Sequence, residues 1–170
     1  MSSVRARFLL RIGPDLVCEP FDPDDPTVRE SMAQAQQRGH IDGALDVNDA
    51  GKPLACSDIW DHLDAMLAAW IAALRELKNG AIRSVALFPD TRIECEMTAL
   101  TLGRIQVEYE LVETGVDREA LDKGLCDAAQ RLLDLADACQ VQTSALAKLL
   151  ALVSSPAATH HPTAPPPRQA

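Results

Sequence analysis

Glutamates at alternating positions of two neighbouring segments are the residues in this chain whose types and spacing could do chemistry. Two carboxyl groups that flank a bond form the acid–base pair of glycosidases. Glu94 and Glu96 share one side of a segment that alternates between polar and apolar residues, and Glu108 and Glu110 share one side of the next. An amphipathic strand requires polar residues at such positions whatever its function. The spacing therefore favours a solvated strand face over a catalytic pair.

Residues 46–51 begin like a calcium-binding loop, with acidic or amide groups at the first and third positions and glycine at the sixth. The resemblance to such a loop then fails. Ala50 stands at position five, and Ser57 stands at position twelve, where a bidentate glutamate is required. A hairpin turn explains these residues better. The acidic, proline-rich stretch at residues 19–26 has no histidine beside it and predicts a solvated loop.

The histidines give little sign of a reactive site. His62 follows Asp61 at the expected start of a helix, but no serine or cysteine accompanies it in the setting of a nucleophilic triad. His40 lies in a loop, and residues 160–161 are two histidines in a proline-rich tail. Phosphate-binding, nucleophile-elbow and dinucleotide-binding motifs are absent from the sequence. We therefore expect no catalytic residue, no cofactor and no metal, and a protein that is not an enzyme.

The two acidic segments are predicted to be neighbouring strands. Residues 91–98 and 104–111 alternate strictly, and the short link between them predicts antiparallel pairing. All four glutamates have even numbers, so they share one face of the sheet if paired residue numbers sum to an even value. A sum near 202 would set Glu94 opposite Glu108.

The role of this acidic surface depends on the position of the first strand. Residues 4–12 alternate as well, with Arg5, Arg7 and Arg11 on the polar side. If this strand lies beside the other two, its arginines neutralise the glutamates within the sheet. If it lies elsewhere, the glutamates are free to attract a basic protein, and complementary charge would raise the association rate and the selectivity. The sequence alone leaves both alternatives open.

The clearest helix is predicted over residues 58–79, with Ser57 as its N-cap and Trp70 on its apolar stripe. Earlier in the chain, Thr27 and Glu30 have the spacing of a capping box at the start of a short helix. The other expected elements are a strand at 4–12 with a short return at 16–18, a helix at 27–38, a hairpin at 41–55, strands at 83–88, 92–98 and 104–112, and helices at 117–139 and 144–153.

This order predicts a two-layer α+β fold, in which an antiparallel sheet, made of a meander plus the N-terminal strand, packs against two or three helices. The 170 residues are 47% apolar, which indicates one globular domain, placed at residues 1–153. Residues 154–170 are proline-rich, lack a packable pattern and predict a disordered tail. The net charge of −9 argues against binding to nucleic acid or to anionic membranes.

The cysteines indicate a reducing compartment. Their number is odd, no CxxC motif occurs, and they fall at positions that read as apolar faces. The N-terminus lacks the apolar run of a signal peptide, and no segment approaches the ~20 apolar residues of a membrane span. We therefore expect a cytoplasmic protein. The five cysteines are Cys18, Cys56, Cys95, Cys126 and Cys139.

With these elements placed, the chain resembles the small acidic immunity proteins that neutralise secreted bacterial toxins. The layout carries the resemblance: an amphipathic strand at residues 5–12, a helix that bears Trp60 and Trp70 and ends at Gly80, an acidic meander and a last helix. The resemblance covers about residues 4–140. It implies a cytosolic inhibitor that binds one cognate toxin domain without catalysis, and it assigns no specific binding residue.

The leading hypothesis is therefore a non-enzymatic bacterial binding protein with a basic protein as its partner. A half-exposed indole at Trp60 would either anchor that partner or cover the edge of the sheet. A homodimeric secretion chaperone or adaptor is the alternative, and an enzyme is the third, which would need a polar pocket around Asp61 and His62. The expected partner-binding residues are Glu94, Glu96, Glu108, Glu110, Trp60 and Asp61.

Overall fold

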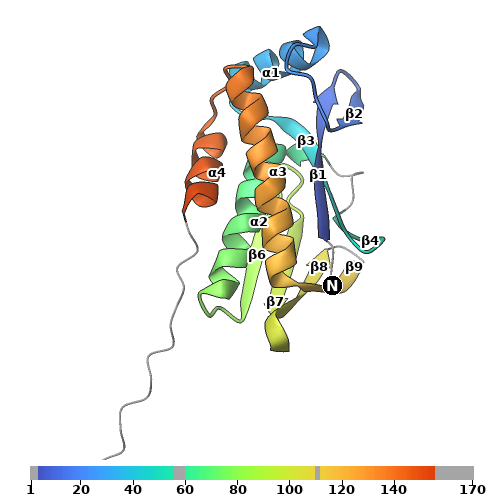
Figure 1. The fold of residues 1–170 in the computed structure, drawn as a ribbon, viewed down its shortest axis with the longest axis vertical. Helices are drawn as coiled ribbons and strands as arrows, with labels where there is room; N and C mark the ends of the chain where they lie inside the picture. The colour runs from blue at the N-terminus through green and yellow to red at the C-terminus, as the bar shows by residue number, and fades with distance from the viewer. Residues whose placement is uncertain (1–3, 56–59, 110–111, 156–170) are drawn as a thin grey trace, which may run out of the picture.

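The expected α+β class is confirmed by antiparallel sheets that pack against helices. The computed structural model describes residues 4–55, 60–109 and 112–155. In these ranges the helices are α1 (Pro26–Arg38), α2 (Leu63–Lys78), α3 (Arg118–Ala138) and α4 (Ser144–Ser154). Helices α2 and α3 run side by side over the sheets, and α4 packs against both of them (Figure 1).

The first sheet holds the N-terminal strand. Its strand order is β2-β1-β3-β4, and a two-residue strand, β5, also pairs with β3. The expected hairpins over residues 4–18 and 41–55 are both present, and β4, which carries Pro53, lies at an edge as a strand proline favours. The strands are β1 (Val4–Ile12), β2 (Asp15–Cys18), β3 (Asp42–Asp49), β4 (Lys52–Ala55) and β5 (Asp61–His62).

The second sheet is the expected meander with one strand more than predicted. A third strand was expected over residues 104–112, followed directly by a helix. Instead the chain turns after β8 and returns as β9, which pairs along the whole of β8. This strand was missed because its residues 112–117 include Gly115 and offer only a short alternation. The strands are β6 (Arg83–Leu87), β7 (Glu94–Ala99), β8 (Arg104–Tyr109) and β9 (Val112–Asp117), with a 3-10 turn, η1 (Thr101–Gly103), between β7 and β8.

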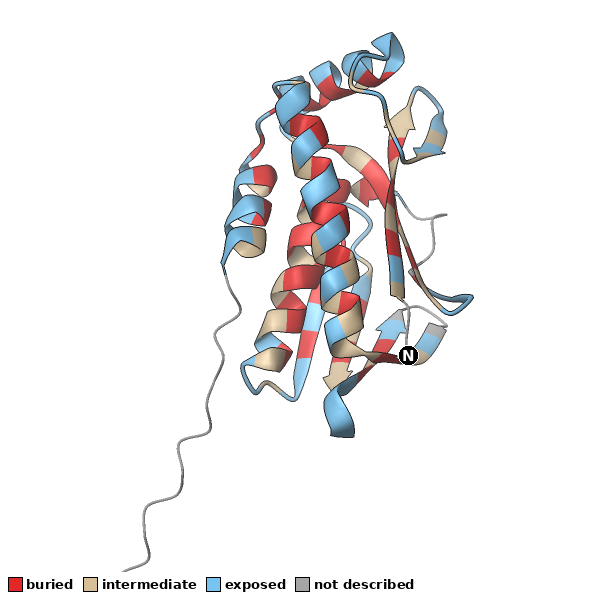
Figure 2. Cartoon of the chain, viewed as in Figure 1, coloured by how far each residue is buried: buried red, intermediate tan, exposed pale blue. Residues whose placement is uncertain are grey.

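The core lies between the helices and the inner faces of both sheets. Figure 2 shows the buried residues gathered on the sides of α2 and α3 that face each other and the sheets. Trp70 of α2 is fully buried, as its place on the apolar stripe predicts. Phe8 and Leu10 of β1 and Met97 and Val107 of the meander meet the same core. The two sheets therefore share one hydrophobic core.

Helix α2 begins later than predicted. The expected start at residue 58 and the N-cap Ser57 lie outside the described residues, but Asp61 and His62 form strand β5 and the helix begins at Leu63. The backbone N–H of Leu63 donates to the carbonyl of Ile41 at 2.7 Å, which holds this end of the helix against the chain just before β3. Pairing with β3 therefore overrides the helical spacing of the first residues.

The N-cap of α1 also differs from the prediction. Asp25 caps this helix, and one oxygen of its carboxylate accepts hydrogen bonds from both the backbone N–H and the hydroxyl of Thr27. Pro26 occupies the first helical position, where a missing N–H costs nothing, so the cap falls one residue before it. The expected capping box of Thr27 and Glu30 is therefore replaced by an aspartate cap.

None of the helices in the described ranges combines the length and the apolar composition that a membrane crossing requires.

The turn after β3 is a hairpin turn, as expected, because the side-chain oxygen of Asn48 accepts the backbone N–H of Gly51 at 2.7 Å. Asp46, the first residue of the calcium-like sequence, lies within β3 and forms an ion pair with Arg7 of β1.

Candidate functional site

The outward surface of β6–β9 is the strongest candidate for a functional site. The other surface of these strands is buried against the core. Cross-strand pairing places the outward residues side by side. We call these residues the acidic face: Arg83, Val85, Leu87, Glu94, Glu96, Thr98, Arg104, Gln106, Glu108 and Glu113.

Carboxylates form a row across three strands of the acidic face. Glu96 of β7 is the direct partner of Glu108 of β8, and Glu108 is in turn the direct partner of Glu113 of β9. Glu94 lies two residues along β7 on the same side. Three of the four expected glutamates are thus brought together, while Glu110 lies outside the described residues. Glu113 was missed because the strand that carries it was not predicted.

Two arginines of the acidic face, Arg83 and Arg104, offset part of this row. Glu96 forms an ion pair with Arg83 of the neighbouring strand. Glu108 accepts a hydrogen bond at 2.8 Å from the neutral amide of Gln106. The guanidinium of Arg104 donates to the backbone carbonyl of Gly115 at 2.7 Å. With four glutamates against two arginines, the acidic face keeps a net negative formal charge.

An exposed apolar strip flanks the carboxylates. Val85 and Leu87 of β6 are 40% and 54% exposed, and their direct partners on β7 are Glu96 and Glu94. Ile82, just before β6, is also exposed. β6 is an edge strand of its sheet. Exposed aliphatic side chains beside charges are what a protein-binding surface presents, with apolar contact at its centre and polar contact at its rim.

The register of β7 and β8 differs from the prediction by two. Glu94 was expected opposite Glu108, with a sum near 202, whereas Glu96 stands there and the sum is 204. The chain between the strands contains the 3-10 turn, where Leu102 takes a left-handed φ of 59°. The pairing begins at Ala99 with Ile105 as a result. The even sum was predicted correctly, so the glutamates do share one face.

The arginines of β1 do not neutralise the acidic face. β1 belongs to the other sheet, where it pairs with β2 and β3. Arg7 forms its ion pair with Asp46 of β3, and the guanidinium of Arg11 lies 3.9 Å from the ring centre of Trp60. Of the two alternatives that the sequence left open, internal neutralisation by Arg5, Arg7 and Arg11 is therefore wrong for the described glutamates.

Trp60 is accessible, whereas Asp61 is not. The Trp60 side chain is 41% exposed and stacks under Arg11, so it can still contact a partner. Asp61 is 1% exposed, and its carboxylate accepts the backbone N–H groups of His62, Asp90 and Thr91 at 2.6 to 3.0 Å. Its expected place on a docking surface is therefore corrected: Asp61 ties the start of α2 to the loop between β6 and β7.

The ionisation of Asp61 follows from these contacts. Burial by itself would raise the pKa of Asp61, but hydrogen bonds from the backbone of Thr91, His62 and Asp90 and from the Thr91 hydroxyl outweigh it. The net effect holds the pKa below the usual 3.8, so the carboxylate is charged at neutral pH. The charged carboxylate of Asp61 therefore holds the loop between β6 and β7 against the start of α2.

Two histidines that the sequence keeps far apart come into contact. The rings of His40 and His62 stack with centroids 3.7 Å apart. Nε2 of His40 lies 3.2 Å from Oδ1 of Asp42, and the guanidinium of Arg38 holds the other carboxylate oxygen. His62 was expected on a helix surface, but it lies in β5 opposite Asp42 of β3. The sequence pattern does not predict this cluster, because the pairing of β3 with β5 creates it.

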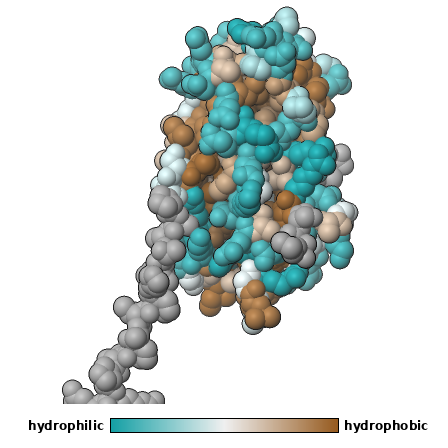
Figure 3. All heavy atoms as spheres, in the orientation of Figure 1, coloured by the Kyte–Doolittle hydropathy of each residue, from teal (hydrophilic) through white to brown (hydrophobic). Residues whose placement is uncertain are grey.

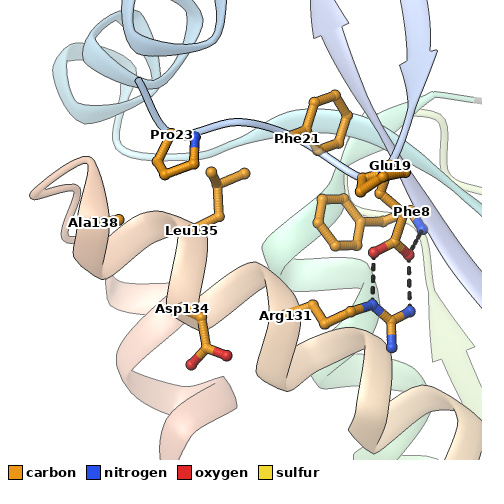
Figure 4. Close-up of a pocket in the computed structure, with 9 residues that line it drawn as sticks. Phe8, Glu19, Phe21, Pro23, Arg131, Asp134, Leu135 and Ala138 are labelled. Atoms are coloured by element: carbon orange, nitrogen blue, oxygen red, sulfur yellow. Dashed lines mark hydrogen bonds and ion pairs between the residues drawn. The ribbon is translucent and has the colours of Figure 1, made fainter. Parts of the chain in front are cut away.

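The acidic, proline-rich loop is anchored to α3 and is not free in solvent. Both carboxylate oxygens of Glu19 accept from the guanidinium of Arg131 at 2.6 and 2.8 Å, and one also accepts the backbone N–H of Phe8 (Figure 4). A cavity of about 270 Å³ lies between this loop and α3, and Phe21 and Leu135 line it. Hydrophilic side chains cover the side of α3 that faces the viewer in Figure 1, as Figure 3 shows in the same orientation.

Cavities of about 270, 440 and 670 Å³ lie along α3, and neither Asp61 nor His62 lines any of them. The polar pocket that an enzyme would need around these two residues is therefore not among these cavities.

The described cysteines are free thiols. Burial raises the pKa of Cys95, on the inner side of β7, to about 12. Burial together with the charge of Asp122 raises the pKa of Cys126 to about 11. Cys18 and Cys139 are half-buried, and Cys56 lies outside the described residues. The thiols with a raised pKa are small packing groups rather than nucleophiles.

No family model, curated protein or solved structure matches this chain.

Proposed function

We propose that this chain is a non-enzymatic, cytosolic binding protein that docks a basic protein through its acidic face, most concretely as an immunity-type inhibitor of a bacterial toxin. One observation carries the proposal: the carboxylates of Glu96, Glu108 and Glu113 stand in a row beside the exposed side chains of Val85 and Leu87.

Charge supports a basic partner. The chain has a net charge of −9, and among the described residues of the acidic face Glu94 and Glu113 have no ion-pair partner. A basic protein would be drawn to this surface by its long-range field, and like-charged proteins would be repelled. The field accelerates encounter, while burial of Val85 and Leu87 would slow dissociation.

Shape supports a protein rather than a small molecule. None of the three cavities along α3 includes a residue of the acidic face. A small ligand generally requires a concave site that buries most of its surface. An open sheet face that combines charge with exposed aliphatic side chains instead suits a broad contact with another protein.

The decisive experiment is co-expression with the protein encoded by the neighbouring gene, followed by measurement of the Kd and of its salt dependence. The proposal expects a complex with a basic domain. It expects the triple substitution Glu94→Arg, Glu108→Arg and Glu113→Arg to weaken that complex by roughly 100-fold or more. The control Asp15→Arg, Glu30→Arg and Asp137→Arg changes the net charge equally at exposed positions outside the face, and it should retain the complex. Equal effects of the two triple variants would reject the acidic face as the binding surface.

The edge of β6 favours a second candidate function, a homodimeric secretion chaperone or adaptor. Its exposed side chains Ile82, Val85 and Leu87 accompany a strand that, within the described part of the chain, is paired on one side only. Pairing of two β6 edges would extend the sheet across a dimer. Sedimentation of the purified chain distinguishes the two: a strictly monomeric species excludes the dimeric chaperone and leaves the first proposal standing.

A further inference from the structure

His40, Asp42 and His62 meet at the point where β3 pairs with β5. Asp42 and His62 are direct cross-strand partners, and His40 lies two residues before Asp42. Each side chain offers one ligand atom, and these atoms all lie within 4.8 Å of one another. This cluster lies on the first sheet, so it is separate from the acidic face on the second.

The spacing of the donor atoms fits one metal ion. Nε2 of His40 lies 3.2 Å from Oδ1 of Asp42. Two ligands that each bind zinc at about 2.0 to 2.1 Å, at tetrahedral or octahedral angles, stand about 2.8 to 3.4 Å apart. The two ligand atoms thus need little movement to bind the same ion, and a ring nitrogen of His62 lies within 4.8 Å of both as the third candidate ligand.

The carboxylate is already oriented for this task. The guanidinium of Arg38 holds Oδ2 of Asp42, which leaves Oδ1 directed at His40. The Asp42 side chain is only 10% exposed, so its position is restricted. A hydrogen-bonded partner that fixes a ligating carboxylate from behind is the usual outer support of a metal site.

The backbone beneath the cluster is equally fixed. Gly43 pairs with both Leu10 of β1 and Asp61 of β5, and a Cβ at this position would lie 2.2 Å from the carbonyl oxygen of Leu9. β3 is therefore held closely between the two strands. His62 makes no capping hydrogen bond with its side chain, although it occupies the N-cap of α2, so its ring is available as a ligand.

The ligand types select the class of metal. Two imidazoles and one carboxylate suit zinc and neighbouring divalent transition metals, whereas magnesium and calcium prefer a shell of oxygen ligands. Three protein ligands that are each partly exposed would leave a coordination position open to water. We propose that His40, Asp42 and His62 form a binding site for a divalent transition metal ion, with zinc as the representative ion.

Binding would link the metal to the fold. The ion would join β3 to β5, directly before the first residue of α2. Since the ligand atoms must be free of protons, binding would weaken as the pH falls. A bound ion would also raise the thermal midpoint in proportion to the logarithm of the free metal concentration.

The test is calorimetric titration of the whole chain with Zn²⁺ alone at pH 7.5, and we expect one ion per chain. The variant His40→Ala with His62→Ala should lose roughly 100-fold or more in affinity. The matched control His160→Ala with His161→Ala removes the same number of imidazoles from the tail and should bind like the wild type. Titration with Co²⁺ should give visible bands without the intense thiolate charge-transfer band that cysteine ligands would produce.

Three results would overturn the site. The first is equal zinc affinity in the double variant and in the wild type. The second is a Co²⁺ spectrum dominated by a thiolate band. The third is the release of no binding heat at a 100-fold excess of Zn²⁺ over protein. Circular dichroism in the presence of a chelator checks the fold of each variant. Asp42→Asn provides an independent second variant should the double variant unfold, and it too should bind Zn²⁺ at least roughly 10-fold more weakly.

Discussion

Glu96 of β7 stands directly opposite Glu108 of β8, and Glu108 stands directly opposite Glu113 of β9. Like charges at directly opposed positions destabilise a sheet by up to about 1 kcal/mol for each pair. The ion pair between Arg83 and Glu96 offsets part of this cost at one end of the row. The centre of the row, Glu108, therefore carries most of the repulsion.

Replacement of Glu108 by lysine should stabilise the protein, because it converts two repulsive pairs into two attractive ones. We expect the free energy of unfolding to rise by about 0.5 to 1 kcal/mol at low salt, measured by urea denaturation. Glu30→Lys on the exposed side of α1 changes the net charge equally and serves as the control. The difference between the two variants should shrink in 1 M salt. Equal stabilities of the two variants at low salt would contradict the repulsive row.

Much of the fold could be predicted from periodicity. The alternation of residues 94–98 and 105–107 placed β7 and β8 and assigned their inner and outer faces correctly. The exact register could not be predicted, because it depends on the left-handed turn at Leu102, a residue whose type does not require that conformation. Strand β9 was not predicted for a related reason, since a glycine and a short length are typical of a loop.

The site residues were predictable only where they followed the strand pattern. Glu94, Glu96 and Glu108 were placed correctly on one face because parity alone decides it. Asp61 was not, because its partners Asp90 and Thr91 lie about 30 residues further along the chain. The histidine cluster likewise depends on tertiary pairing, which overrides the helical spacing of the sequence around it.

Cys95 should resist alkylation in the folded protein. Burial raises its pKa to about 12, so almost no thiolate exists at pH 8, and the side chain is fully enclosed. A timed exposure to iodoacetamide, read by mass spectrometry of the peptides, should show labelling of Cys95 only at the rate of unfolding. A sample in 8 M urea gives the fully reactive reference. Labelling of Cys95 in the native protein as fast as in urea would show that β7 is not packed as described.

Glu19 and Arg131 should be energetically coupled across 112 residues of chain. The Glu19 carboxylate is almost enclosed and makes two hydrogen bonds to the guanidinium, while Arg131 remains partly exposed to water. A double-mutant cycle with alanine at both positions should give a coupling energy of about 1 to 2 kcal/mol, less than for a fully buried pair because solvent screens the arginine.

The same helix contains a matched control for this cycle. Lys123 and Asp127 form an ion pair four residues apart in α3, and both side chains are exposed. Their coupling energy should not exceed about 0.5 kcal/mol. If the two cycles gave equal values, the proline-rich loop would not be anchored by Glu19, and its packing over the cavity beside Phe21 would need another cause.

Replacement of Asp61 by asparagine should cost the largest share of stability among these variants. The carboxylate accepts from Asp90, Thr91 and His62, and an amide of the same shape loses the charge and turns one acceptor into a donor that faces donors. We expect a loss of about 2 to 3 kcal/mol at pH 7, measured by urea denaturation. Asp15→Asn, at the exposed start of β2, should change stability by less than about 0.5 kcal/mol.

The pH dependence separates a charged role of Asp61 from one of shape alone. The folded pKa of Asp61 lies below its unfolded value, so the stabilisation is complete above the unfolded pKa of about 3.9 and is lost as pH falls through the folded pKa. The difference between wild type and Asp61→Asn should therefore be constant from pH 7 to about pH 5 and shrink below about pH 4. A difference that stays constant down to pH 2 would mean that the ionised carboxylate contributes nothing, and that the variant is destabilised by packing alone.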